Sequence, residues 1–178
     1  MTQRTPRLNY DVAGATRPAD DEWPSRPPGY RGFERTIGLG GGADRWHAVA
    51  EAVMTWQVKR RSGFTVTPAD GGDIRARTGA GYELVARVGP LRVREPVRVV
   101  AVVDSLDRCG FAYGTLRGHP VSGEEAFIVH RTPDGRVWLT LRSLTRPADG
   151  WWGRAFPALL LAQRVYRRRY LRAPAEAR

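Results

Sequence analysis

Beyond residue 64, apolar and polar residues alternate with a period of two, and short connections join several of the alternating segments. Successive side chains of a β-strand point to opposite faces, so this pattern predicts strands with one buried face. Connections such as "DRCG" and "TPDG" are typical of hairpins, which join antiparallel strands. The expected strands of this sheet cover residues 64–67, 82–88, 96–104, 110–117, 124–131 and 136–144.

Helical patterns lie on either side of these strands. After an expected strand at residues 32–40, Asp44 is a suitable N-cap for a helix that ends near Arg61, where Gly63 stops it. Residues 154–172 repeat apolar side chains at helical spacing and predict a long C-terminal helix. We therefore expect an α+β fold. Its curved antiparallel β-sheet has an N-terminal helix after the first strand, and the long C-terminal helix packs across the sheet.

The length of 178 residues suits one domain with one hydrophobic core. Residues 1–31 are rich in proline and show no periodic pattern, which predicts an extended N-terminal arm. Leu8 and Tyr10 form an apolar pair in this arm, and we expect them to pack on the domain. The single α+β domain is expected at residues 32–173, and residues 174–178 are expected to form a disordered tail.

Cysteine usage and the N-terminal sequence predict a cytoplasmic protein. Cys109 is the single cysteine, so the chain cannot form an internal disulfide. The first residues lack the apolar core of a secretory signal. The longest strongly apolar run, residues 156–162, is far shorter than the roughly 20 residues that cross a bilayer. We therefore expect no transmembrane segment.

The net charge of +11 is concentrated toward the C-terminus. Of the 29 basic residues, 28 are arginine and only Lys59 is lysine. Residues 142–178 hold nine arginines against Asp149 and Glu176. A basic surface of this kind attracts anionic polymers or lipids without specificity, so weak, non-specific binding of nucleic acid is expected. The sequence contains no recognisable module that reads nucleic-acid sequence.

The sequence offers no motif for a cofactor or a metal. "GLGGGADRW" at residues 38–46 lacks the full glycine spacing of a dinucleotide fingerprint, and the hairpins that follow do not suit such a fold. Its glycines are better explained by a tight turn into the helix. Three scattered histidines and one cysteine lack the spacing of metal ligands.

The segment "GFAYGTLRGHPVSGEEAFIVHR" at residues 110–131 places two adjacent glutamates in a predicted hairpin. If Arg117 faces Glu124, the two form an exposed cross-strand ion pair worth less than about 1 kcal/mol. Alternation then puts Glu125 on the same face as Phe127 and Val129. If that face is the concave one, a carboxylate there needs a polar partner or a raised pKa.

Candidate partners for Glu125 are Tyr113 on the neighbouring strand, His119 in the turn, and Arg142 or Arg146 at the end of the next strand. These groups suit either the polar end of a ligand pocket or a buried structural network. The expected ligand-binding residues are Tyr113, His119, Glu125 and Arg146. No catalytic residue is assigned.

Five segments carry a resemblance to a known family: "LNYDVAGATR", "LGGGADRWHAVAEAVMTW", "FAYGTLRGHPVSGEEAF", "SLTRPAD" and "QRVYRRRYL". Together they span nearly the whole chain, which resembles the bacterial and plant proteins of the domain of unknown function 1990 family. The resemblance implies that the N-terminal arm belongs to the domain. It also implies a helix-grip layout similar to START and Bet v 1-like proteins, in which a curved sheet grips a long helix over a cavity. It supplies no accepted catalytic residues.

Three hypotheses for function follow. The leading hypothesis is a non-enzymatic domain that binds a small, largely apolar molecule between the sheet and the C-terminal helix. The second is an enzyme that uses Glu125 and His119 as an acid–base pair on a small molecule. The third is a basic adaptor that contacts nucleic acid, a membrane or a protein partner. A cavity distinguishes the first two hypotheses from the third.

Overall fold

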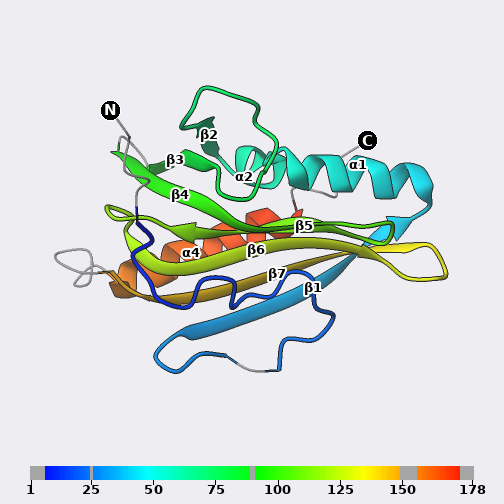
Figure 1. Ribbon diagram of the computed structural model, residues 1–178, viewed down its shortest axis with the longest axis horizontal. Coiled ribbons are helices and arrows are strands. Elements are labelled where there is room, and N and C mark those ends of the chain that lie inside the picture. The colour runs from blue at the N-terminus through cyan, green and yellow to red at the C-terminus, as the bar shows by residue number, and fades with distance from the viewer. Residues whose placement is uncertain (1–6, 25, 89–90, 149–155, 173–178) are drawn as a thin grey trace.

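The computed structural model describes residues 7–24, 26–88, 91–148 and 156–172 (Figure 1). The expected tail at residues 174–178 lies outside this part of the chain. The helices are α1 (Ala43–Met54), α2 (Gln57–Arg61) and α4 (Phe156–Arg172). The strands are β1 (Arg31–Gly41), β2 (Phe64–Pro68), β3 (Gly81–Val88), β4 (Leu91–Asp104), β5 (Arg108–Thr115), β6 (Val121–Arg131) and β7 (Arg136–Pro147).

The strands form one antiparallel sheet in the order β1-β7-β6-β5-β4-β3-β2. Chain neighbours pair from β2 through β7, and β1 adds to the outer edge of β7. Figure 1 shows α4 crossing behind the sheet, with α1 and α2 near one side. The described chain is therefore the expected α+β fold, with an antiparallel sheet and a long C-terminal helix against it.

The first helical region differs from expectation, because two helices replace one continuous helix from Asp44 to Arg61. Gly42 is the N-cap, and the chain breaks at Trp56, whose φ of 60° is left-handed. For a side chain other than glycine, this conformation costs roughly 1–2 kcal/mol. The break carries the Trp56 ring into the core, so packing overrides helical continuity.

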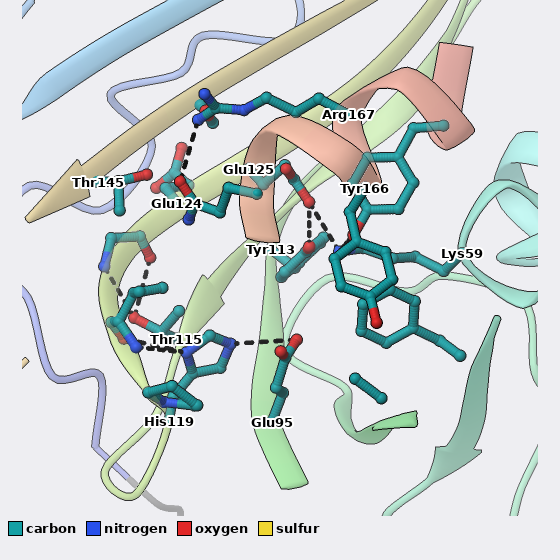
Figure 2. Close-up of a pocket in the computed structure, with 18 of the residues that line it drawn as sticks. Lys59, Glu95, Tyr113, Thr115, His119, Glu124, Glu125, Thr145, Tyr166 and Arg167 are labelled. Atoms are coloured by element: carbon teal, nitrogen blue, oxygen red, sulfur yellow. Dashed lines mark hydrogen bonds and ion pairs between the residues drawn. The ribbon is translucent and has the colours of Figure 1, made fainter. Parts of the chain in front are cut away.

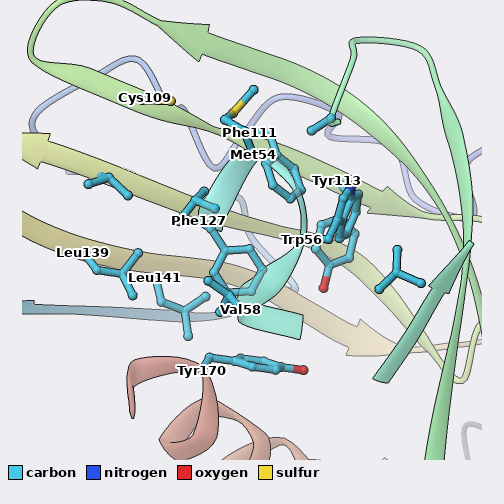
Figure 3. Packing of buried hydrophobic residues seen from close by; sticks show 14 of the residues in the cluster. Met54, Trp56, Val58, Cys109, Phe111, Tyr113, Phe127, Leu139, Leu141 and Tyr170 are labelled. Atoms are coloured by element: carbon cyan, nitrogen blue, oxygen red, sulfur yellow. The ribbon is translucent and has the colours of Figure 1, made fainter. Parts of the chain in front are cut away.

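The core fills the space between the concave face of the sheet and the helices. Trp56 is only 1% exposed, and its ring centroid lies 4.8, 4.5 and 5.3 Å from those of Tyr82, Phe111 and Tyr113 (Figure 3). Tyr170 of α4 packs its ring edge-on against Phe127, with centroids 5.5 Å apart. The helices and the sheet therefore share one core, and α4 belongs to it.

The register of the β5–β6 hairpin corrects the expected one. Gly114 pairs with Glu124 and Tyr113 with Glu125, so the expected pairing of Arg117 with Glu124 is wrong. β6 begins at Val121, and Gly123 lies inside the strand rather than in the turn. A Cβ atom on Gly123 would lie 1.9 Å from the carbonyl oxygen of Leu144. This glycine therefore permits the close approach of β7 and does not mark the turn.

The N-terminal arm runs along the face of the sheet opposite the helices, which is the convex face (Figure 1). Leu8 forms an isolated bridge with Leu116, and Tyr10, Thr16 and Trp23 are all buried. The Tyr10 ring occupies the space that Gly114 leaves, where a Cβ atom would lie 2.2 Å from the tyrosine hydroxyl. The convex face is therefore covered, and alternating residues are buried on both sides of β6.

Two charged side chains of the convex face bind the arm. Glu124, only 3% exposed, accepts hydrogen bonds from the Tyr10 hydroxyl, the Gly14 amide, and both the amide and the hydroxyl of Thr16. Arg142, 1% exposed, donates to four carbonyl oxygens of the arm between Thr16 and Asp21 and pairs with Glu34 at 2.8 Å. Glu124 is therefore a buried anchor for the arm and not a surface residue.

Candidate functional site

A cavity of about 110 Å³ lies between the concave face of the sheet and α4 (Figure 2). Its apolar walls come from β2, β3, β4, β5 and α4: Phe64, Ala86, Val93, Tyr113, Tyr166 and Tyr170. Its charged and polar groups include Lys59, Glu95, His119, Glu125, Ser143 and Arg167. The volume is that of several water molecules or a small organic group.

Lys59 and Glu125 form the buried polar centre of this cavity. The Nζ atom of Lys59 lies 2.9 Å from Oε2 of Glu125 and donates a hydrogen bond of 2.7 Å to the Tyr170 hydroxyl. The Tyr113 hydroxyl donates to the same carboxylate oxygen. The amine also lies 4.4 Å from the ring centroid of Tyr170 and 4.7 Å from that of Phe64. Lys59 is thus a buried cation that is surrounded by aromatic rings and ion-paired with Glu125.

The two tyrosines of this centre remain protonated. Burial raises the pKa of Tyr113 and of Tyr170 well above the usual value, and the negative charge of Glu125 raises each pKa further. Both hydroxyls therefore act as hydrogen-bond donors at neutral pH. Tyr113 donates its hydrogen to Glu125, whereas no described residue accepts the hydrogen of Tyr170. Among the same residues, Oε1 of Glu125 accepts no hydrogen bond, so one donor and one acceptor stay available in the cavity.

A second pair of groups, Glu95 and His119, lines another part of the cavity. Nε2 of His119 lies 3.7 Å from Oε2 of Glu95, while its Nδ1 accepts a hydrogen bond of 3.1 Å from the Val121 amide. Burial lowers the pKa of His119 to about 3, and the charge of Lys59 contributes to this. Burial raises the pKa of Glu95 to about 7 against the opposing charge of Lys59. The histidine is therefore neutral at neutral pH, and Glu95 is close to its titration midpoint.

Three of the four expected ligand-binding residues line the cavity: Tyr113, His119 and Glu125. Arg146 does not. Its guanidinium lies beside Ser122 and Asp11 and over the Tyr30 ring, at 4.9 Å from the centroid, so it contacts the arm side of the sheet. Residue 146 follows Thr145, which lines the cavity, and adjacent strand residues face opposite ways.

Sequence reasoning missed Lys59, Glu95 and Arg167. Lys59 carried a usable signal, because a single lysine among 28 arginines marks a position where arginine does not suffice. Glu95 and Arg167 carried none, since each lies in a segment with several other charges. The supposed acid–base pair is not formed either, because His119 faces Glu95 while Glu125 binds Lys59 and Tyr113.

Two further properties concern only the described part of the chain. No helix there is long and apolar enough to cross a membrane. No three side chains of histidine, cysteine, aspartate or glutamate in the same residues come together as a metal site would require.

Comparison with solved structures supports the architecture. The chain is similar to the Zhui aromatase/cyclase of Streptomyces sp. R1128, with a TM-score of 0.61 at 16% identity over 82% of this chain and 92% of that one. It is also similar to a hypothetical protein of Helicobacter pylori, with a TM-score of 0.58 at 8% identity over 83% and 88% of the two chains. At these identities the likeness concerns the fold, which is of the helix-grip kind.

Comparison of sequences finds two relatives that bear the name UPF0548 protein. The relative from Deinococcus radiodurans is 45% identical over 75 residues, which make up 42% of this chain and 38% of the relative. The relative from Arabidopsis thaliana is 26% identical over 136 residues, or 73% of this chain and 64% of the relative. Each match thus spans less than two thirds of the relative. The profile of one family, Domain of unknown function (DUF1990), matches residues 9–173, and the chain belongs to that family.

Proposed function

We propose that this protein binds a small, largely apolar molecule in the cavity between the sheet and α4. The observation that carries the proposal is the cavity itself, in which aromatic walls surround a few polar groups. Sites for small molecules are commonly of this kind, with apolar walls and a small number of placed polar groups. The similar fold of an aromatase/cyclase adds support, because such an enzyme has to hold an organic molecule.

The polar centre suggests how the ligand is oriented. The hydroxyl hydrogen of Tyr170 and Oε1 of Glu125 are free of partners among the described residues, so a ligand carbonyl or hydroxyl group can use them. Tyr113 and Lys59 hold the Glu125 carboxylate in place. The neutral imidazole ring of His119 forms the part of the cavity wall next to Glu95. These residues form the polar part of the proposed site.

We do not extend the proposal to acid–base catalysis by Glu125 and His119. An acid–base pair needs its groups within reach of one reacting atom and with pKa values near the working pH. His119 contacts Glu95 and the Val121 backbone instead, and its pKa is lowered to about 3 by burial. Binding is therefore the activity that the geometry favours.

Native mass spectrometry of the protein purified from its own host tests the proposal. The wild-type protein should carry a co-purifying small molecule. Ala86 lies on β3 in the cavity wall and is 2% exposed, so Ala86→Leu places extra carbon atoms in the space that the ligand needs. This variant should lose the bound mass.

Ala112→Leu is the matched control. Ala112 is fully buried in the separate cluster with Ala126 and Ile128, outside the cavity wall. Both substitutions overpack the interior, at roughly 1–3 kcal/mol each, but only one of them changes the cavity. Retention of the bound molecule by Ala86→Leu, or its loss from both variants alike, would show that the ligand does not occupy this cavity.

A further inference from the structure

The guanidinium of Arg167, on α4, lines the cavity and forms no ion pair with a carboxylate of the described residues. Its Nη2 atom donates to the Ser143 hydroxyl at 2.7 Å and to the Gln163 side-chain oxygen at 3.4 Å. The guanidinium also lies over the Phe33 ring, 4.2 Å from its centroid. In Figure 2 the side chain extends from the helix over the sheet. All three of these contacts are with neutral groups.

The two buried cations of the described residues are paired with carboxylates, whereas Arg167 is half-buried. Lys59 lies 2.9 Å from Glu125, and Arg142 lies 2.8 Å from Glu34. For Arg167, no carboxylate of the described residues lies within 4 Å, and its buried Nε has no hydrogen-bond acceptor among them. A buried guanidinium N–H without an acceptor is costly, since water is excluded and nothing replaces it.

The surroundings do not neutralise this charge. The carboxylate whose charge acts on Arg167 is Glu125, which is already bound by Lys59 and Tyr113. Burial lowers the pKa of Arg167, the charge of Glu125 opposes this change, and Arg164 and Arg31 add positive charge nearby. Arg167 therefore places a positive charge without a carboxylate partner among the described residues at the wall that it forms with Ser143.

We propose that the ligand of this cavity carries a carboxylate, which pairs with the Arg167 guanidinium at that wall. This inference rests on the proposed function, because it names the chemical class of the molecule bound at the same site. A guanidinium offers a planar fork of donors that matches a carboxylate in shape and charge. The apolar part of the ligand then lies against Phe64 and Tyr166, which line the same cavity.

Two probes of almost the same shape test the inference. Benzoate carries a carboxylate, and benzamide replaces it with a neutral amide. Titration calorimetry at neutral pH should give a Kd for benzoate at least about tenfold lower than for benzamide, because a charge-assisted pair replaces a neutral hydrogen bond. Each probe has a single ring, in keeping with the small volume of the cavity.

Three variants test whether Arg167 causes the preference for the carboxylate probe over the amide probe. Arg167→Met should reduce the preference to less than about twofold, while Arg167→Lys should retain part of it. Arg168→Met is the matched control, because Arg168 is the next residue of α4 and is exposed. It removes the same charge from the same helix and should leave the preference unchanged. Thermal unfolding of each variant verifies that the domain remains folded.

The outcomes separate this inference from the proposal on which it rests. Binding of both probes with equal affinity would overturn the carboxylate assignment and leave the cavity as a ligand site. The assignment would also be overturned if the preference persists in Arg167→Met or disappears in Arg168→Met. Failure of both probes to bind, together with no co-purifying molecule, would overturn both proposals.

Discussion

At the scale of single residues, the two adjacent glutamates of β6 have separate partners. Glu124 faces the arm and accepts four hydrogen bonds there, whereas Glu125 faces the cavity and binds Lys59 and Tyr113. Alternation placed Glu125 on the same face as Phe127 and Val129, and that face packs on the main core. It did not predict the role of Glu124, because that role depends on a segment more than 100 residues away in the chain.

Replacement of Glu124 should be costly. Glu124→Ala leaves the hydroxyls of Tyr10 and Thr16 and the amides of Gly14 and Thr16 without their acceptor in a buried region. We expect a loss of about 2–4 kcal/mol in the free energy of unfolding, measured by denaturant titration. Glu22→Ala is the control, since Glu22 is an exposed glutamate of the same arm. A loss below about 1 kcal/mol for Glu124→Ala would mean that the arm is not held by this carboxylate.

Glu95 and His119 should give stability two opposing dependences on pH. The pKa of Glu95 is raised to about 7, so the folded protein holds a proton that the unfolded chain releases above about pH 4.5, and stability falls as pH rises toward 7. The pKa of His119 is lowered to about 3, so the unfolded chain takes up a proton below about pH 6.5 and stability falls as pH drops from there. Between about pH 4.5 and 6.5 the two effects offset each other.

Single substitutions should expose each dependence. In Glu95→Gln only the histidine effect remains, so the free energy of unfolding should rise from about pH 4.5 to 6.5 more steeply than in the wild type. In His119→Asn only the carboxyl effect remains, and the free energy should rise less steeply or fall. Between about pH 4.5 and 6.5 each effect is on the order of 2–3 kcal/mol. Denaturant titrations across this pH range provide the measurement, and parallel curves for the wild type and both variants would contradict the assignment.

At the scale of elements, the arm is attached by polar contacts as much as by apolar ones. Arg142 donates to backbone carbonyls of Thr16, Arg17, Asp20 and Asp21, which hold this part of the arm in one conformation. Its guanidinium also lies 5.9 Å from the centroid of the buried Trp23 ring. The arm therefore completes the convex side of the sheet.

Loss of these contacts should release the arm. In Arg142→Met the carbonyls lose their donor and Glu34 loses its cation, so a glutamate-specific protease should cleave the Glu22–Trp23 bond at least about tenfold faster than in the wild type. Arg117→Met, in the exposed β5–β6 connection, should not change the rate. Equal cleavage rates for the two variants would show that apolar packing alone retains the arm.

The helices show where sequence patterns reach their limit. Helical spacing and Gly63 predicted where the first helical region begins and ends, but not its break at Trp56, because the break is set by the rings around that side chain. In α4, four of the arginines, Arg164, Arg168, Arg169 and Arg172, are exposed. Arg167 belongs to the same basic run but reaches the cavity wall, a distinction that charge alone does not give.

At the scale of the whole molecule, the sheet is covered on both faces. The helices cover the concave side, and the arm covers much of the convex side (Figure 1). The alternation of apolar and polar residues predicted the antiparallel sheet correctly, because burial of one sheet face repeats every second residue. It did not predict that polar residues on the other face would also be buried, since the covering arm has no periodic pattern of its own.

Only part of the candidate site was predicted, because the sequence pattern relates residues of neighbouring strands but not residues of distant elements. Tyr113 and Glu125 were predicted because alternation along their strands indicates which residues share a face. His119 was predicted because it lies in the short connection between those strands. Lys59 enters from α2, Glu95 from β4 and Arg167 from α4, so their meeting depends on the packing of elements far apart in the sequence. Arg146 lies beside Ser122 and Asp11 on the arm side of β7, and the sequence pattern did not give the position of the arm.

The isolation of Lys59 gives this protein an unusual chemical property. It is the single lysine of the chain, and its amine is enclosed at the polar centre of the cavity. Reagents that modify amines therefore have one side-chain target, which shares its space with the proposed ligand. Because this side chain is only 4% exposed and is paired with Glu125, its modification requires the cavity to open, and a molecule bound there should slow the reaction.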